Sequence, residues 1–207
     1  MAETIAELGG RVVLIDRPGS DYTPLTSRLH QYGTEVFCID CDLESEDERK
    51  QLITEVNEQF LSIDVLINNA AFVGTTDLSG WITSFEEQEI GTWRRAIEVN
   101  LTAAFDLSKS LLPLLKESGK GSIINIASIY GVSGPIHSMY KGTEMGNPAA
   151  YSVSKGGLIQ LTRWLSTTVA PEVRVNTVSP GGVFRQQPQE FVDRYEKRTP
   201  LGRMATE

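Results

Sequence analysis

Apolar and polar positions follow two distinct patterns along the chain. Short runs rich in Val and Ile carry apolar residues at successive positions, as expected for strands that are covered on both faces. Longer stretches repeat apolar residues every three to four positions, which indicates amphipathic helices. Strands are expected at residues 11–16, 35–39, 65–68, 122–127 and 174–178, and helices at residues 22–32, 45–60, 85–116 and 148–169.

The strands and helices alternate along the sequence. Such alternation predicts an α/β fold in which helices cross over between the strands of a parallel sheet. Neither an internal repeat nor a low-complexity linker interrupts the chain, so we expect residues 1–207 to belong to a single domain.

Composition and charge exclude several classes of protein. The chain has 19 Lys and Arg against 27 Asp and Glu, a net charge of −8, which argues against a nucleic-acid partner. We see no cationic leader at the N-terminus and no apolar run of the roughly 18 residues that a membrane span needs. The two cysteines, Cys38 and Cys41, favour a reducing, cytoplasmic compartment and are too few for a metal motif. We therefore expect no membrane partner and no metal.

A tyrosine and a lysine one helical turn apart carry the sharpest chemical signal. Tyr151 and Lys155 stand four positions apart at the start of an expected helix, and thus on one face. A phenol ordinarily ionises near pH 10, and a nearby ammonium group favours its ionised form. The pair is therefore a candidate acid–base device. Taken alone, it also fits a half-buried Tyr beside a surface Lys.

Polar residues end several expected strands. Ser128 follows the strand 122–127, at the edge of a parallel sheet where ligands bind. The tripeptide Asn68-Asn69-Ala70 ends an earlier strand, and Pro180-Gly181 follows the last one. Asn100 lies within the helical stretch between them. We expect these groups to gather at one edge of the sheet.

With these ordered motifs, the sequence resembles the short-chain dehydrogenase/reductase family over nearly its whole length. The resemblance implies a Rossmann-like, doubly wound parallel sheet and an enzyme that transfers hydride between NAD(H) and an alcohol or carbonyl. By position, Asn100, Ser128, Tyr151 and Lys155 match the catalytic tetrad. The resemblance implies that Tyr151 exchanges the substrate proton and Ser128 hydrogen-bonds the same oxygen. Lys155 would hold the nicotinamide ribose and favour the phenolate, and Asn100 would anchor a water.

The resemblance also assigns cofactor-binding residues. Asp16 ends a strand where an acid accepts the ribose 2′-hydroxyl, and a carboxylate there repels a 2′-phosphate. Asp16 therefore favours NAD over NADP, although the neighbouring Arg17 could hold such a phosphate. By resemblance, further contacts come from Asp42, Leu43, Asn68, Ala70, Tyr151, Lys155, Pro180, Gly181 and Val183.

The expected fold lacks parts of the family's sheet. The Gly-rich pyrophosphate turn lies about 20 residues before the ribose-binding acid, and Asp16 is too close to Met1 for that spacing. Both ends of the sequence also fall within helical patterns. Met1, Ile5 and Leu8 have helical spacing, and Thr206 is typical of a helix start. We expect an incomplete domain that lacks the first strand with its Gly-rich turn and the C-terminal strand. A truncated, non-catalytic binding module or pseudoenzyme is then the alternative function, and weak NAD binding is expected.

The 22 residues between Ser128 and Tyr151 form an unusually long connection. They carry polar side chains that would suit a hydroxylated substrate such as a sugar derivative, or else an oligomer contact. These side chains are Tyr130, His137, Tyr140, Lys141 and Glu144. Residues 145–151 and 198–206 also look like oxidoreductases of bacterial surface-sugar pathways, such as flagellin-modification and nonulosonic acid enzymes.

The resemblance implies a homodimer or homotetramer that pairs through the helices at 100–116 and 150–169. Apolar residues on these helices exceed what one buried face requires. They are Leu101, Phe105, Leu112, Leu158, Leu161 and Leu165.

Overall fold

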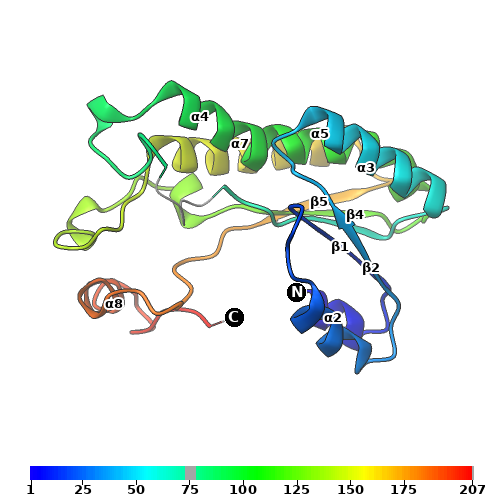
Figure 1. The fold of residues 1–207 in the computed structure, drawn as a ribbon, viewed down its shortest axis with the longest axis horizontal. Helices are drawn as coiled ribbons and strands as arrows, with labels where there is room; N and C mark the ends of the chain where they lie inside the picture. Colours follow the sequence, from blue (N-terminus) through cyan, green and yellow to red (C-terminus); the bar gives the residue numbers. More distant parts are fainter. Residues whose placement is uncertain (73–77, 207) are drawn as a thin grey trace. The chain divides into compact units, whose positions relative to one another are not determined.

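The computed structural model describes residues 1–72 and 78–206. The chain divides into two compact units, Met1–Gln59 and Phe60–Glu207. Figure 1 labels the helices and strands of both units, which are described separately below.

The first unit contains two parallel strands and three helices. Strand β1 (Val12–Asp16) pairs with β2 (Val36–Asp40), so that Asp16 lies opposite Asp40 at the carboxyl ends. The helices are α1 (Ala2–Glu7), α2 (Thr23–His30) and α3 (Glu46–Gln59). Helix α1 is followed by Gly9 with φ of +81°, a left-handed conformation that glycine adopts without strain. A small core of Ala6, Val12 and Leu29 joins β1 to α1 and α2.

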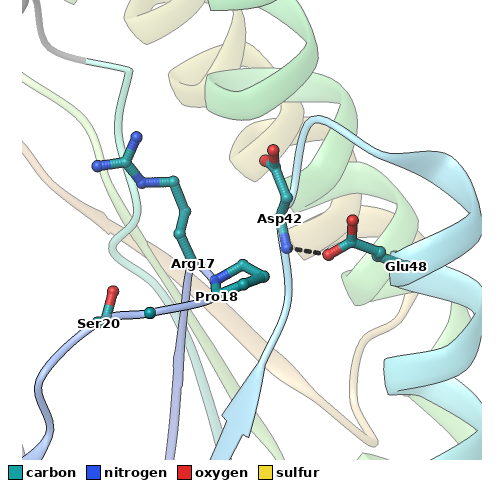
Figure 2. Close-up of a pocket in the computed structure, with 6 residues that line it drawn as sticks. Arg17, Pro18, Ser20, Asp42 and Glu48 are labelled. Carbon is teal, nitrogen blue, oxygen red and sulfur yellow. Dashed lines mark hydrogen bonds between the residues drawn. The ribbon is translucent and has the colours of Figure 1, made fainter.

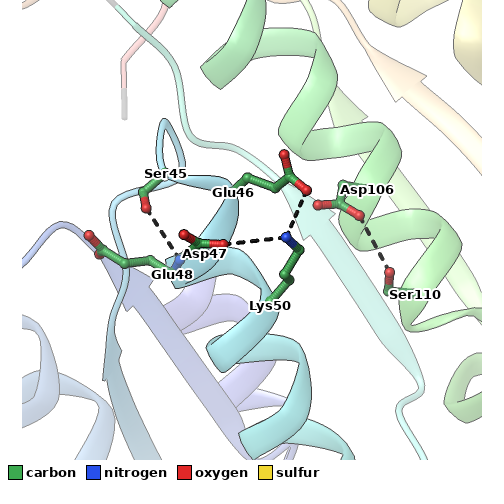
Figure 3. Close-up of polar contacts among 7 residues, drawn as sticks. All are labelled: Ser45, Glu46, Asp47, Glu48, Lys50, Asp106 and Ser110. Atoms are coloured by element: carbon green, nitrogen blue, oxygen red, sulfur yellow. Dashed lines mark hydrogen bonds and ion pairs between the residues drawn. The ribbon is translucent and has the colours of Figure 1, made fainter.

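Polar contacts set the start of α3 (Figure 3). The hydroxyl of Ser45 accepts the N–H of Glu48 at 3.3 Å. The Glu48 carboxylate accepts the N–H of Asp42 at 2.6 Å, as Figure 2 shows. Lys50 pairs with Glu46 at 2.8 Å and with Asp47 at 3.3 Å. Negative side chains in a first helical turn complement the helix dipole. Glu48 thus ties the helix start to the Asp42 segment.

The second unit is built on a three-stranded parallel sheet in the order β3-β4-β5. These strands are Val65–Asn68, Ser122–Ile126 and Arg174–Val178. Its helices are α4 (Ile90–Ile97), α5 (Ala103–Ser110), α6 (Leu112–Glu117), α7 (Ala149–Thr168) and α8 (Gln189–Glu196). Short turns are η1 (Phe85–Glu87), η2 (Glu98–Thr102), η3 (Ile129–Gly131) and η4 (His137–Met139). Helices α4, α5 and α7 run along one face of the sheet (Figure 1).

The main core of this unit lies between the sheet and its helices. It is a cluster of six buried apolar residues that come from α6, β4, α7 and β5 and their connections. They are Leu115, Ile123, Leu165, Val169, Val173 and Val175. Polar contacts on α5 stay at its surface, where the Ser110 hydroxyl donates to Asp106 at 3.5 Å (Figure 3).

The parallel α/β architecture confirms the sequence prediction, and every expected strand is found to within one residue at each end. The single helix expected over 85–116 is wrong. It is broken by a π-helical turn at Glu98–Thr102 and again after Ser110, where Pro113 opens α6. Proline lacks the N–H that would continue the preceding helix.

The sheet of each unit ends on a strand that has one neighbour among the described residues. Among residues 1–72 and 78–206, β1 pairs with β2 alone and β3 with β4 alone, so the strands form two sheets. Near the C-terminus, Ala205 forms an isolated bridge with Val183, and Glu207, which would continue the helix start expected at Thr206, lies outside the described residues.

Candidate active site

Lys155 is the buried centre of the candidate site. It lies one turn into α7, its side chain is 2% exposed, and its Nζ donates to the carbonyl of Ile126 at 2.7 Å. The same Nζ is 5.9 Å from the centre of the Tyr151 ring, within the range of a cation–π contact. Burial lowers the pKa of Lys155 to about 8. The group therefore stays cationic at neutral pH and loses its charge just above it.

The start of α7 is fixed from outside the helix. Pro148 precedes the first turn, and the side-chain oxygen of Gln88 accepts the N–H of Ala149 at 3.1 Å. Ser152 donates to Asn147 at 2.6 Å across the same turn. An exposed helix start needs such partners, and here they place Tyr151 in the first turn. Sequence reasoning missed Gln88, because its partner is 61 positions away.

Ser128 ends β4 and lies against α7. Its Oγ accepts the N–H of Tyr130 at 3.2 Å, which leaves its own hydroxyl proton to donate. A Cβ on Gly131 would lie 2.7 Å from the carbonyl carbon of Lys155. A side chain at that position would push the turn away from the helix. Glycine therefore allows the Ser128 turn to approach the backbone of Lys155.

Asn100 lies in the π-helical turn η2, and such turns are frequent at functional sites. Its Oδ1 accepts the N–H of Phe72 at 2.6 Å, and its Nδ2 donates to the hydroxyl of Ser154 at 3.0 Å. The buried amide thus links the segment after β3 to α7, one residue before Lys155. Both polar atoms of the side chain are engaged in this link.

Asn68 directs its side chain into the core. Its Nδ2 donates to Asn125 at 2.8 Å, and Asn125 donates onward to Thr162 at 2.8 Å. This chain of bonds joins β3, β4 and α7. A ligand would therefore meet the backbone of Asn68, as it would the backbone of Ala70, which is exposed just beyond β3.

The Pro180 loop joins the Ser128 turn at the end of the sheet. The N–H of Ile129 donates to the carbonyl of Pro180 at 3.1 Å, directly after the pairing of β4 with β5. Val183, two residues past Gly181, pairs with Ala205 in the isolated bridge. The carboxyl ends of β4 and β5 thus bring the Ser128 turn and the Pro180 loop together.

The other cofactor candidates, Asp16, Asp42 and Leu43, belong to the first unit. The exposed carboxylate of Asp16 accepts the N–H of Arg17 at 2.8 Å. Figure 2 shows the neighbouring surface pocket of about 410 Å³, which Arg17, Ser20, Asp42 and Glu48 line together with Pro18 and Gly19. Asp42 also accepts the N–H of Glu44 at 2.9 Å. The carbonyl of Leu43 accepts from the Arg49 guanidinium at 2.5 Å.

Tyr22 fixes the end of β1 and was not singled out in the sequence. Its hydroxyl accepts the N–H of Asp16 at 3.0 Å and donates to the carbonyl of Ile39 at 3.0 Å. Burial raises the pKa of Tyr22 to about 12, so it remains a neutral phenol. The sequence could not predict this role, because a tyrosine just before a helix occurs in many structural settings.

The described residues hold no group of three or more His, Cys, Asp or Glu side chains that could bind a metal ion. Within those same ranges, every helix is too short or too polar to cross a bilayer.

The family model described as short chain dehydrogenase matches residues 1–193. The chain belongs to the short-chain dehydrogenase family. The rhamnolipid-biosynthesis 3-oxoacyl-[acyl-carrier-protein] reductase of Pseudomonas aeruginosa is 32% identical over 87% of this chain. The cis-4-hydroxycyclohexanecarboxylate dehydrogenase of Sinomonas cyclohexanicum is 30% identical over 99% of it. The chain spans 66% and 77% of the lengths of these two short-chain dehydrogenase relatives.

Solved structures of short-chain dehydrogenases are similar to this chain. One from Leptospira borgpetersenii with bound NAD⁺ has a TM-score of 0.79 and 33% identity, and the match covers 98% of this chain and 73% of that one. The Pseudomonas aeruginosa RhlG/NADP active-site complex has a TM-score of 0.81 and 28% identity, with coverage of 99% and 77%. These similar structures bind NAD⁺ or NADP. Neither of these two relatives is named as a flagellin-modification or nonulosonic acid enzyme.

Proposed function

We propose that this short-chain dehydrogenase transfers hydride between a nicotinamide cofactor and an alcohol or carbonyl substrate. One observation carries the proposal. The buried ammonium of Lys155 bonds to the end of β4, two residues before Ser128, and lies beside the ring of Tyr151. A phenol, a serine hydroxyl and a cation at the end of a parallel sheet are the groups that proton exchange at a carbonyl oxygen needs.

The roles follow from the contacts of each side chain. A bound nicotinamide would accept or return the hydride of the substrate carbon. During alcohol oxidation, the phenolate form of Tyr151 would take the hydroxyl proton and become the phenol, and during carbonyl reduction the phenol would give that proton back. Ser128 donates its unused hydroxyl proton to the same oxygen. Lys155 keeps a positive charge beside the phenol, and Asn100 positions α7 through Ser154.

Each unit, taken by itself, carries groups that suit one part of a dinucleotide. The Asp16 carboxylate is exposed at the end of β1 to meet a ribose diol, and the pocket beside it offers Ser20 and Asp42. In the second unit, Lys155, Pro180 and Val183 would contact the nicotinamide part.

We favour NAD over NADP because the carboxylate of Asp16 would repel a 2′-phosphate. Arg17 lines the adjacent pocket and is the competing feature. Titration calorimetry with NAD⁺ and NADP⁺ tests this preference. The wild-type chain is expected to bind NAD⁺ more tightly, and Asp16→Ala to narrow or reverse the difference. Arg17→Ala is the matched control and should not improve NADP⁺ binding; tighter NADP⁺ binding by the wild type would refute the preference.

We further propose a polar substrate, such as a sugar derivative of a bacterial surface-sugar pathway. His137, Lys141 and Glu144 remain exposed on the long connection after Ser128. Tyr140 does not serve this purpose, because it is buried and donates to the hydroxyl of Tyr130. The preference is measured by comparing turnover of polyols and sugar nucleotides with turnover of apolar secondary alcohols. The polar substrates are expected to turn over faster.

Replacement of Tyr151 by Phe tests the catalytic proposal. The variant keeps the ring and loses the proton, so turnover should fall about 10²- to 10⁴-fold. Cofactor affinity and thermal stability should change little. Tyr32→Phe, an exposed tyrosine of the first unit, serves as the control. Turnover of Tyr151→Phe within twofold of the wild type would refute the acid–base role.

A non-catalytic binding module is the second candidate. It is favoured by the two strand edges of β1 and β3, which have no second neighbour among the described residues. Such a module would bind nucleotide, or a partner strand, without turnover. Tight NAD⁺ binding without turnover on any alcohol tested would favour it.

We also propose a homodimer or homotetramer in the cytoplasm. Phe105 on α5 and Trp164 on α7 are 44% and 56% exposed, and such apolar exposure suits a contact between copies. Leu158 and Leu165 do not contribute, because both are buried within the unit. Light scattering at micromolar concentration should give a multiple of 22.8 kDa.

The free thiols of Cys38 and Cys41 suit a reducing compartment.

A further inference from the structure

The loop from Gly182 to Phe184 is held by contacts from three later segments. The N–H of Gly182 donates to the hydroxyl of Tyr195 on α8 at 2.6 Å. Ala205 donates its N–H to the Gly182 carbonyl at 2.9 Å and accepts the N–H of Phe184 at 2.8 Å. Gln187 donates its side-chain amide to the Val183 carbonyl at 2.8 Å. Four hydrogen bonds thus fix three residues.

Glycine is required where Tyr195 meets this loop. A Cβ on Gly181 would lie 2.6 Å from the Tyr195 hydroxyl oxygen. A Cβ on Gly182 would lie 3.0 Å from the same ring and 2.8 Å from the methyl group of Met204. The pair of glycines therefore allows the phenol to reach a backbone N–H that side chains would shield.

The ring of Tyr195 is itself held in place. Its centre lies 6.1 Å from that of Phe191, one turn earlier on α8. Tyr195 packs against a small second core of buried residues from η4, α8 and the chain end. They are Met139, Tyr140, Phe191, Val192 and Met204. A phenol supported in this way is oriented before any ligand arrives.

One backbone N–H of this loop, that of Val183, is available to a ligand. Within the described ranges, the N–H of Val183 has no hydrogen-bond acceptor, whereas its carbonyl and both neighbouring N–H groups are engaged. We propose that Tyr195 is a positioning residue that fixes this loop so that the Val183 N–H meets a carboxamide oxygen of the ligand. The inference rests on the proposed function, because it assigns that oxygen to the nicotinamide.

The hydrogen bond itself is tested in the protein without ligand. Amide hydrogen exchange of Gly182, followed by NMR, is compared between the wild type, Tyr195→Phe and Tyr140→Phe. Loss of one acceptor should speed exchange of Gly182 by about fivefold or more in Tyr195→Phe. Tyr140→Phe removes a phenol from the same apolar cluster and should leave that rate unchanged. Thermal unfolding confirms that both variants are folded.

Two results would overturn the proposal at this stage. One is wild-type exchange at Gly182 in Tyr195→Phe. The other is equally fast exchange in both variants, because this would reflect general loosening of the cluster. Tyr195→Leu, which also removes the ring packing, should exchange at least as fast as Tyr195→Phe.

Ligand binding separates positioning from a merely structural role. NAD⁺ and ADP-ribose share every group except the nicotinamide. Tyr195→Phe should weaken NAD⁺ binding about three- to tenfold and leave ADP-ribose binding unchanged. Equal losses for both ligands would overturn the assignment. If the wild type binds neither ligand, the proposed function fails, and the exchange rates alone decide whether Tyr195 holds the loop.

Discussion

In the first unit, the candidate ligand groups lie on the surface and are held through the backbone, whereas in the second unit they are buried and held through side chains. Asp16 keeps its carboxylate in solvent while Tyr22 fixes its N–H. In the second unit, the polar side-chain atoms form hydrogen bonds that join β3, β4 and α7, as at Lys155, Asn100 and Asn68. Under the proposed function, the first kind of group would select a ligand, and the second kind would keep the geometry that proton exchange needs.

The largest effect of a substitution is expected at Asn125, which is fully buried in the second unit. Asn125→Ala removes the 2.8 Å acceptor of the Asn68 amide and the donor to the Thr162 hydroxyl, so that these groups keep only their bonds to Ser108 and Leu158. We expect the free energy of unfolding to fall by about 3 kcal/mol, measured by urea denaturation. Asn176→Ala is the control, because Asn176 is exposed on β5 of the same sheet. Equal effects of the two variants would contradict the distinction between buried and surface groups.

The buried charge of Lys155 should appear as a pH dependence of stability. Its pKa is about 8 in the folded chain and near 10.5 when unfolded. Between these values the unfolded state binds more protons, so stability rises with pH, and it is independent of this group below pH 8. Relative to Lys155→Met, the wild type should gain about 2 kcal/mol from pH 7.5 to 10. Parallel unfolding curves for the two proteins across this range would show that Lys155 is solvated.

Tyr22 tests how the first unit holds Asp16. Tyr22→Phe removes one acceptor and one donor between β1 and β2, and we expect a loss of about 1 kcal/mol. Native-state hydrogen exchange of the Asp16 amide measures this loss locally. Tyr32→Phe, also in the first unit and exposed, is the control. An unchanged Asp16 amide would show that strand pairing alone fixes this end of β1.

The smallest effect is expected for the ion pair of Arg11 and Glu35. Their charged groups are 3.4 Å apart, and both side chains are about two-thirds exposed (64% and 66%). Solvent screens such pairs, so Arg11→Ala should shift the thermal midpoint by less than about 2 °C. A larger shift of the thermal midpoint, measured by calorimetry, would show that exposed charges contribute substantially to the stability of the first unit.

Local patterns predicted the elements well where one residue type dominates. The strand 65–68 and the helix at 148–169 follow from runs of apolar residues and from Pro148. The helix expected over 85–116 failed, because amphipathic periodicity hardly changes across a π-helical turn. The acidic start of α3 was readable, but not that Glu48 would bond Asp42 rather than its own helix end.

The candidate site divides in the same way. Ser128, Tyr151, Lys155 and Asp16 could be singled out because each stands at a strand end or a helix start. Gln88 and Tyr195 could not, because each acts on a backbone group far along the chain. Likewise, Leu158 and Leu165 were expected on an oligomer surface but lie in the core, while Trp164 between them is exposed.

The sequence by itself determined the parallel α/β pattern and the family, and it named the candidate reactive groups, since these depend on local periodicity and on short motifs. The tertiary structure alone decided which of those groups are free to act. Burial lowered the pKa of Lys155, and the amides of Asn100 and Asn68 became structural links. Both outcomes depend on desolvation and on partners distant in sequence, which no local pattern encodes.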